Sequence, residues 1–67
     1  MYKIEISKVG NNKYYEIITI DSLEILITFM LNRVGDNEQI TIYKNNEFVI
    51  CDTKNNIIIK AIKKNLL

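Results

Sequence analysis

The side chains that could carry out acid–base or metal chemistry in this sequence are eight carboxylates and one thiol, that of Cys51. The chain has no histidine, which excludes a His/Cys zinc site and the Ser-His and Cys-His arrangements of nucleophilic catalysis. The carboxylates lack the spacing of a calcium loop, and exposed strand charges that discourage edge pairing explain them more simply than acid–base catalysis. They are Glu5, Glu16, Asp21, Glu24, Asp36, Glu38, Glu47 and Asp52.

Cys51 and the two glycines are expected to have structural roles only. Without a histidine beside it, the Cys51 thiol has no evident means of activation, so we expect it to be a half-buried packing residue. Gly10 and Gly35 are too few to form a glycine-rich phosphate loop. The sequence therefore predicts that the protein is not an enzyme and that it has no catalytic residue, no cofactor site and no metal site.

Tyrosines and lysines could together bind single-stranded nucleic acid by stacking and charge. If the strand register is as expected, Tyr15 and Tyr43 lie on one sheet face together with Lys3 and Lys60. Two carboxylates expected on that face, those of Glu5 and Glu47, would repel phosphate. The net charge is only +1, although residues 52–67 carry four lysines against one aspartate. We therefore do not expect nucleic acid as a partner, and a solvated basic end is the simpler interpretation of residues 52–67.

Alternating apolar and polar residues predict two paired strands at the start of the chain. Residues 2–8 place Tyr2, Ile4 and Ile6 on one side, and residues 14–20 are rich in β-branched and aromatic side chains. The Gly-Asn-Asn-Lys cluster at 10–13 is typical of a turn. These strands should form a hairpin.

A helix is predicted from Asp21 to about Val34. Asp21 is suited to the N-cap position, Glu24 three residues later resembles a capping box, and Gly35 is suited to the residue after the helix. At 100° per residue, four apolar side chains cluster within about 60° and two flank them, so this face should cover the sheet. The cluster is Leu23, Ile27, Met30 and Val34, flanked by Leu26 and Leu31.

The rest of the chain is predicted to add more strands. Residues 38–44 and 47–52 alternate and are joined by Asn45-Asn46, a two-residue hairpin loop of type I′. Ile57, Ile58 and Ile59 suit a further strand, whereas residues 60–67 could continue that strand or form a short terminal helix.

The predicted fold class is therefore α+β, in the order β-β-α-β-β-β. A single domain spanning residues 1–67 would have two layers, with one helix packed on a mostly antiparallel sheet of four to five strands. The expected core is Ile4, Ile6, Ile18, Ile20, Leu23, Leu26, Ile27, Met30, Leu31, Val34, Ile40, Ile42, Phe48 and Ile50.

One feature of the predicted helix points to a partner. Ile25 and Phe29 lie one turn apart and point away from the core-facing cluster. The helix therefore has apolar residues on a second side, in addition to the face that covers the sheet. We expect them to form a partner interface together with Asn32 and Arg33. The alternative is that residues 62–67 fold back over the pair.

Composition and segment lengths bear on the location of the protein. The start of the chain alternates and lacks the apolar region of a signal peptide, and the apolar stretch 25–31 is too short to cross a bilayer. A lone cysteine fits a reducing cytoplasm. The 14 Ile, 9 Asn and 8 Lys residues, all from AT-rich codons, suggest a low-GC bacterium or its phage. We expect a cytoplasmic protein, in a bacterial or phage-infected cell, without a membrane partner.

The run Ile20-Asp21-Ser22-Leu23-Glu24, followed by an apolar helix up to Gly35 and by Ile40-Thr41-Ile42, resembles small single-domain proteins of phages and mobile elements, of the anti-CRISPR type. That resemblance covers residues 15–43, implies an inhibitor that binds a host protein, and transfers no site residue. The function expected is a non-catalytic protein-binding module that acts as a homodimer. The alternative is a small nucleic-acid-binding or regulatory protein that uses the open sheet face or the basic C-terminal segment.

Overall fold

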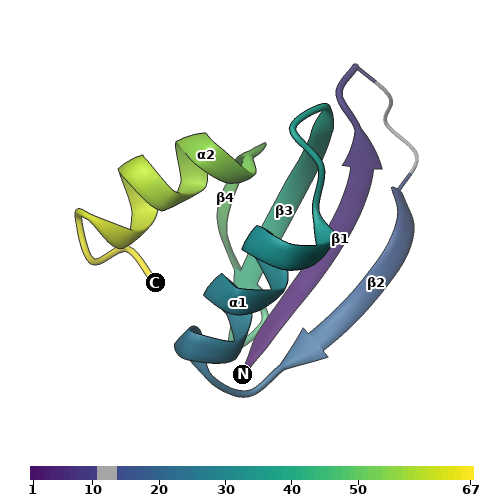
Figure 1. Cartoon of the computed structure of the whole chain (residues 1–67). Helices are drawn as coiled ribbons and strands as arrows, with labels where there is room; N and C mark the ends of the chain where they lie inside the picture. The colour runs from purple at the N-terminus through teal and green to yellow at the C-terminus, as the bar shows by residue number, and fades with distance from the viewer. Residues whose placement is uncertain (11–13) are drawn as a thin grey trace.

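A four-stranded antiparallel sheet forms one layer of the molecule and helices form the other (Figure 1). The computed structural model describes residues 1–10 and 14–67, apart from the side chains of residues 14 and 15. The elements, in chain order, are β1 (Tyr2–Lys8), β2 (Tyr14–Ile20), α1 (Leu23–Arg33), β3 (Glu38–Lys44), β4 (Glu47–Thr53), α2 (Lys54–Ile57) and a π-helical turn, η1 (Ile58–Ile62). The predicted α+β class is confirmed.

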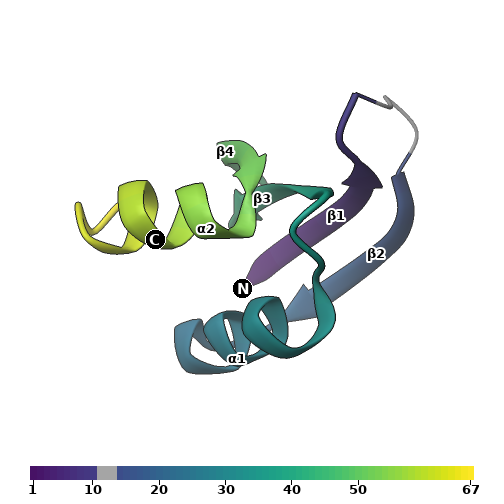
Figure 2. The same cartoon turned by 45° about the horizontal axis from the view of Figure 1, so that its top comes forward.

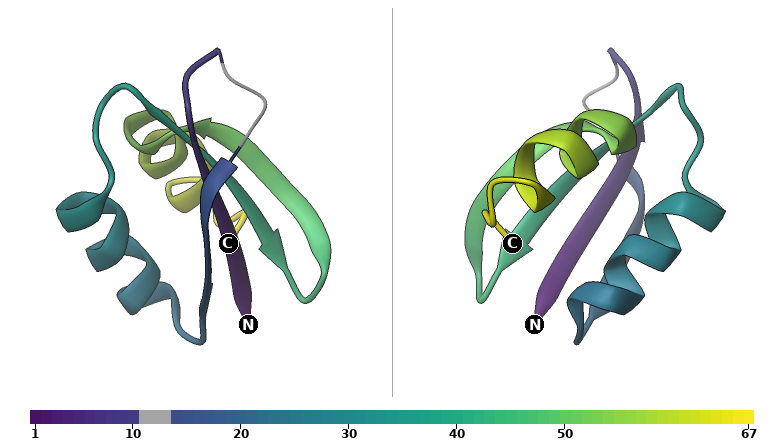
Figure 3. Two further views of the ribbon diagram at one scale, coloured as in Figure 1. Left: turned by 90° about the vertical axis from the view of Figure 1, so that its right-hand side faces the viewer. Right: turned by 60° about the vertical axis from the view of Figure 1, so that its left-hand side comes forward.

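The strand order is β2-β1-β3-β4, and every neighbouring pair is antiparallel. β1 therefore lies inside the sheet, and the connection from β2 through α1 to β3 passes over it. Both helical segments lie on the same face of the sheet (Figure 2). α1 packs against β2, whereas α2 packs against β4 and β3 (Figure 3). Two short helices therefore share the task of covering one sheet face.

The predicted strand at Ile57–Ile59 is wrong, because these residues are helical. Ile57 and Ala61 are four residues apart and both are buried, so one helical face meets the sheet. Ile58 and Ile62 repeat this spacing and pack beside the core, whereas Ile59 is exposed. The sheet has four strands because this segment covers it instead of extending it.

The N-cap of α1 lies one residue later than predicted. Its N-cap is Ser22, whose Oγ accepts a hydrogen bond from the Ile25 N–H at 3.2 Å, so Asp21 lies outside the helix and the expected capping box is not formed. The helix ends at Arg33, and Val34 is an extended C-cap with φ −105°. Gly35 does not adopt a positive φ, and its N–H donates to the Glu38 carboxylate.

Of the two predicted turns, the structure describes one completely. The Asn45-Asn46 loop is confirmed: the two residues have φ of 51° and 70°, as a type I′ turn requires. The predicted turn at residues 10–13 lies mainly outside the described residues, although Gly10 has the left-handed φ of 84° that a turn favours.

Eight residues of the predicted core are buried: Ile4, Ile6, Ile20, Leu26, Met30, Val34, Ile40 and Ile42. Four more are half-buried against them: Ile18, Leu23, Ile27 and Ile50. Leu31 and Phe48 are 55% and 61% exposed, so their prediction as core residues is wrong. The buried apolar residues that the prediction missed, among those described, are Tyr2, Ile57 and Ala61.

The two errors have separate physical causes. α1 is rotated so that Leu26 and Met30 point into the core, which turns Leu31 outward. In β4, Ile50 pairs with Ile42 but Phe48 pairs with Tyr43, so β4 holds one extra residue at a bulge. The bulge moves Phe48 to the face opposite the helices.

In the described part of the chain, none of the helices has the length and apolar character needed to cross a membrane.

Leu26 and Leu31 allow a matched stability test within α1. Replacing the fully buried Leu26 by Ala should lower the free energy of unfolding by about 2–5 kcal/mol, because the substitution leaves a cavity. Leu31→Ala, made at an exposed position of the same helix, should change it by less than about 0.5 kcal/mol. Urea denaturation followed by circular dichroism measures both, and equal losses would contradict the observed rotation of α1.

Candidate functional site: the outer face of α1

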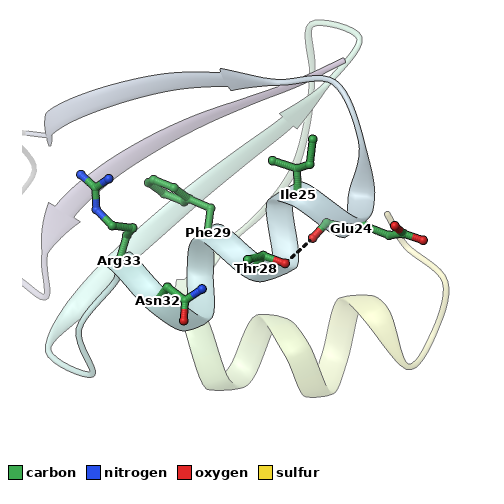
Figure 4. A pocket seen from close by; sticks show the side chains of 6 residues that line it. All are labelled: Glu24, Ile25, Thr28, Phe29, Asn32 and Arg33. Carbon is green, nitrogen blue, oxygen red and sulfur yellow. Dashed lines mark hydrogen bonds between the residues drawn. The ribbon is translucent and has the colours of Figure 1, made fainter.

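Six side chains of α1 border an open groove of about 530 Å³ on the surface of the helix (Figure 4). This α1 groove is lined by Glu24, Ile25, Thr28, Phe29, Asn32 and Arg33. The four residues predicted as a partner interface, Ile25, Phe29, Asn32 and Arg33, all belong to it. The structure thus brings the predicted residues together on one surface, and Glu24 and Thr28 complete that surface.

The apolar part of the groove consists of one exposed side chain and one half-buried side chain. Ile25 is 58% exposed, whereas Phe29 packs partly against the core. The exposure of Ile25 follows from the rotation of α1, because burying Leu26 and Met30 leaves Ile25 on the outer side of the helix. Figure 4 shows Ile25, Phe29 and Arg33 on the side of α1 that faces away from the C-terminal helix, which consists of α2 and η1.

The polar side chains frame this apolar pair. The Arg33 guanidinium lies 5.7 Å from the centre of the Phe29 ring, within the range of a cation–π contact. The Thr28 hydroxyl donates to the Glu24 carbonyl at 2.9 Å, which satisfies the hydroxyl within the helix. Glu24 lies in the first turn and Arg33 in the last, where each charge complements the helix dipole. The groove is thus negative at one end and positive at the other.

The C-terminal segment does not cover Ile25. The helix from Lys54 to Ile62 packs on β4 and β3, and beyond it the Leu67 carbonyl accepts a hydrogen bond from Lys44 Nζ at 3.5 Å. The alternative in which residues 62–67 fold back over Ile25 and Phe29 is therefore wrong. The C-terminal segment therefore leaves the α1 groove exposed.

The sheet face opposite the helices, here called the open sheet face, carries a second group of side chains. The Tyr43 and Phe48 rings meet edge to face with centroids 6.1 Å apart, and Lys3 Nζ lies 4.7 Å from the centre of the Tyr43 ring. Lys3 also pairs with Glu5 at 3.7 Å. By strand register the residues on this face include Lys3, Glu5, Ile17, Thr19, Gln39, Thr41, Tyr43, Phe48 and Cys51.

Two residues expected on the open sheet face lie elsewhere. Lys60 belongs to η1 on the opposite side of the sheet, where it pairs with Asp52 at 3.3 Å. Glu47 is in register with Lys44, whose ammonium group lies 5.8 Å from the centre of the buried Tyr2 ring. Glu47 therefore shares the helix-covered face. Tyr15 was also expected on the open sheet face, but its side chain is outside the described part of the structure. Phe48, which was predicted as a core residue, lies on this face instead.

Cys51 is exposed on the open sheet face, contrary to its prediction as a half-buried residue. Its sulfur accepts hydrogen bonds from Gln39 Nε2 at 2.9 Å and from the Thr41 hydroxyl at 3.2 Å. Among the described residues, no cluster of three or more cysteine, aspartate or glutamate side chains is arranged to hold a metal ion.

Half of the lysines in the basic C-terminal segment have partners within the fold. Lys54 donates to the Val34 carbonyl and lies 3.8 Å from the Asp36 carboxylate, and Lys60 pairs with Asp52. These contacts join the C-terminal helix to the rest of the protein. Lys63 and Lys64 are exposed.

Comparison of the chain with protein-family models, with curated proteins and with solved structures finds no significant match. The function must therefore be inferred from the residues of this chain itself.

The Asp52 carboxylate holds the C-terminal helix through contacts with Asn56 and Lys60 that depend on its ionisation. Hydrogen bonds from Asn56 and from the Thr53 N–H, with a smaller effect of Lys60, hold the pKa of Asp52 below its ordinary value, although partial desolvation opposes them. A depressed pKa stabilises the folded state above the ordinary pKa of an aspartate, and this stabilisation is lost as the pH falls.

We therefore expect the unfolding free energy of the wild type to decrease more steeply below about pH 4 than that of Asp52→Asn. Urea denaturation at a series of pH values measures the difference, and Asp21→Asn controls for the loss of one carboxylate. Parallel pH profiles for the wild type and Asp52→Asn would contradict the anchoring role.

Proposed function

We propose that this chain is a non-catalytic protein-binding module and that the α1 groove is a contact surface between protein chains. The proposal depends on one observation: Ile25 is 58% exposed beside Phe29, on a helix whose opposite face is already buried. Single exposed apolar residues are common, but Ile25 and the exposed part of Phe29 adjoin each other, and contiguous apolar patches mark interaction surfaces.

The composition of the groove supports the same function. Aromatic and arginine side chains are enriched at interface centres, and Phe29 and Arg33 already contact each other here. Asn32 and Glu24 supply polar groups that suit an interface rim. A chain of 67 residues with one cysteine has no internal disulfide to stabilise it, so covering Ile25 and Phe29 would add to its stability.

The resemblance to anti-CRISPR-like proteins supports a host protein as the target. On this proposal the chain is encoded by a phage or mobile element, works in the cytoplasm of a bacterial or infected cell, and inhibits a host protein by direct binding. Its mode of action is occupation of a surface, because the groove offers apolar contact and opposite charges but no nucleophile. The chain acts as a homodimer.

Site-directed cross-linking tests whether the groove contacts a polypeptide. A photoreactive phenylalanine derivative at position 25 should form a covalent adduct with a polypeptide on irradiation in cells. Phe29→Glu should lower the yield at least about tenfold, because it places a charge at the centre of the contact. Phe48→Glu, which alters an exposed aromatic residue on the opposite face, is the matched control and should leave the yield unchanged.

Two outcomes would contradict a contact through the groove. One is the absence of any polypeptide adduct from position 25 while circular dichroism shows a folded protein. The other is an adduct whose yield does not respond to Phe29→Glu.

One observation favours the second candidate function, which is nucleic-acid binding. Lys3, Tyr43 and Phe48 form a cationic and aromatic group on the open sheet face, as stacking on a single strand requires. The Glu5 carboxylate on the same face opposes it, as does a net charge of only +1.

We expect the affinity for single-stranded DNA or RNA to be weaker than about 1 µM at 150 mM salt, because few cationic groups can displace counterions. Fluorescence anisotropy with labelled oligonucleotides measures it. Tighter binding that is lost in Phe48→Ala would favour this second function over a protein contact.

A further inference from the structure

We propose that an extended segment of the protein bound at the α1 groove adds to the sheet as a fifth strand, paired with the free edge of β2. This inference depends on the proposed function, since it states the conformation and the chemistry of the polypeptide that the groove contacts. The groove and the β2 edge then form one site, in which main-chain hydrogen bonds give affinity and the side chains of α1 give specificity.

The edge of β2 offers a row of backbone groups that matches an extended chain. β2 lies at the end of the strand order, and in the described part of the chain residues 16–20 make backbone hydrogen bonds with β1 alone. In an antiparallel pair, every second residue directs its N–H and C=O away from the neighbouring strand. Such a row of donors and acceptors is a template for the addition of a strand, and its spacing specifies an extended occupant.

The other edge of the sheet, β4, is less suited to strand addition. β4 has a carboxylate near each end, Glu47 and Asp52, and its bulge leaves only residues 50–53 in continuous register. The bulge of β2 lies at the start of that strand, so residues 16–20 stay in continuous register with β1. Glu16 is the only charge of β2, which contains neither lysine nor proline, the residues that usually protect an edge. The addition is therefore expected at β2.

The α1 groove lies beside this edge. α1 packs on β2, whereas the C-terminal helix packs on β4 and β3, towards the other side of the sheet. The flank of α1 that faces away from the C-terminal helix is therefore the flank at the β2 edge, and Figure 4 shows Ile25, Phe29 and Arg33 on it. A strand added about 4.8 Å from β2 would lie next to these three side chains.

The spacing of the three side chains specifies the pattern of the added strand. Ile25, Phe29 and Arg33 follow one another at intervals of four residues, which is about 6 Å along a helix. Alternate residues of a strand are about 6.4–6.8 Å apart, so the side chains that point towards α1 meet the three in succession. Apolar side chains suit Ile25 and Phe29. A carboxylate suits Arg33, which has no carboxylate partner among the described residues.

The direction of the added strand follows from the sheet. Every neighbouring pair of strands is antiparallel, and antiparallel pairing is slightly more stable than parallel pairing. Because α1 runs back along β2 (Figure 4), a strand antiparallel to β2 follows the direction of α1. From its amino end the segment therefore reads apolar, any residue, apolar, any residue, acidic. The partner is a protein with an exposed extended segment of this kind.

Peptide selection tests this pattern. A phage-displayed library of random 12-residue peptides, selected on the folded wild-type chain, should yield binders with two alternate apolar residues and an acidic residue two positions further on. A synthetic peptide of the selected sequence should bind Arg33→Glu about three- to tenfold more weakly than the wild type, because an attraction becomes a repulsion. Replacing its acidic residue by lysine should restore most of the affinity for Arg33→Glu. Lys64→Glu controls for the change in net charge.

Amide hydrogen exchange of the wild type tests the main-chain contact and does not depend on the folding of a variant. Those amides of residues 16–20 that exchange rapidly in the free chain should be protected at least about tenfold by the selected peptide, because they acquire hydrogen-bond partners. The amides of β4 should be unchanged. Strand addition is overturned if the peptide binds without protecting β2, if the selection yields no binder, or if the binders lack the alternation.

Cross-linking at a second position separates this inference from the proposed function. Ile17 is 53% exposed on the open sheet face, on the opposite side of the sheet from α1. A polypeptide along the β2 edge should therefore give the same adduct from a photoreactive phenylalanine derivative at position 17 as at position 25, and position 48 on β4 should give none.

An adduct at position 25 without one at position 17 overturns the inference and keeps the groove as a protein contact. An adduct that contains two copies of this chain does the same, because the occupant is then a second copy. The absence of an adduct at position 25 overturns both.

Discussion

The constraint on which this structure depends is that two short helices must cover one face of a four-stranded sheet. Ile4 on β1 and Ile40 and Ile42 on β3 are fully buried at the centre of that face. α1 contributes Leu26 and Met30, and the C-terminal helix contributes Ile57 and Ala61, in each case a pair four residues apart. Each helix can bury only a narrow stripe. Leu23, Ile27 and Phe29 are half-buried beside this stripe, and Ile25 and Leu31 are consequently left on the outer surface of α1.

Local pattern alone predicted most of the strands and their connections. Period-2 alternation located β1 and β3, and the Asn45-Asn46 pair fixed the β3–β4 hairpin, because few other residues tolerate two successive positive φ angles. The predictions that were wrong concern features that depend on contacts between distant segments of the chain. The extra residue in β4, which reverses the face of Phe48, leaves no mark in the sequence pattern. The rotation of α1 depends on its packing against the sheet, which is formed by distant segments of the chain.

The C-terminal helix was mistaken for a strand for a similar reason. Three consecutive isoleucines have β propensity, but Ile57 and Ala61 lie on one helical face, and burying both against the sheet outweighs that propensity. The spacing of Ile57 with Ala61 and of Ile58 with Ile62 was a signal that could have identified the helix. Because of this error Lys60 was placed on the wrong face, where it was counted toward nucleic-acid binding.

The α1 groove could be predicted because it depends only on helical geometry. Ile25, Phe29, Asn32 and Arg33 follow one another along the helix surface whatever lies beneath, so a small error in rotation does not separate them. The open sheet face depends on the register of every strand, and a single bulge changed its membership.

The two surfaces also differ in how far their side chains are already engaged. On the open sheet face, Lys3 contacts Tyr43 and Glu5, and the Cys51 sulfur accepts bonds from Gln39 and Thr41. A partner there would have to replace contacts that the chain already makes. In the groove, a partner that covers the exposed part of Ile25 displaces only water from it. Burial of apolar surface is the free-energy contribution that most often drives association. This difference favours α1 over the sheet as the surface that meets another chain.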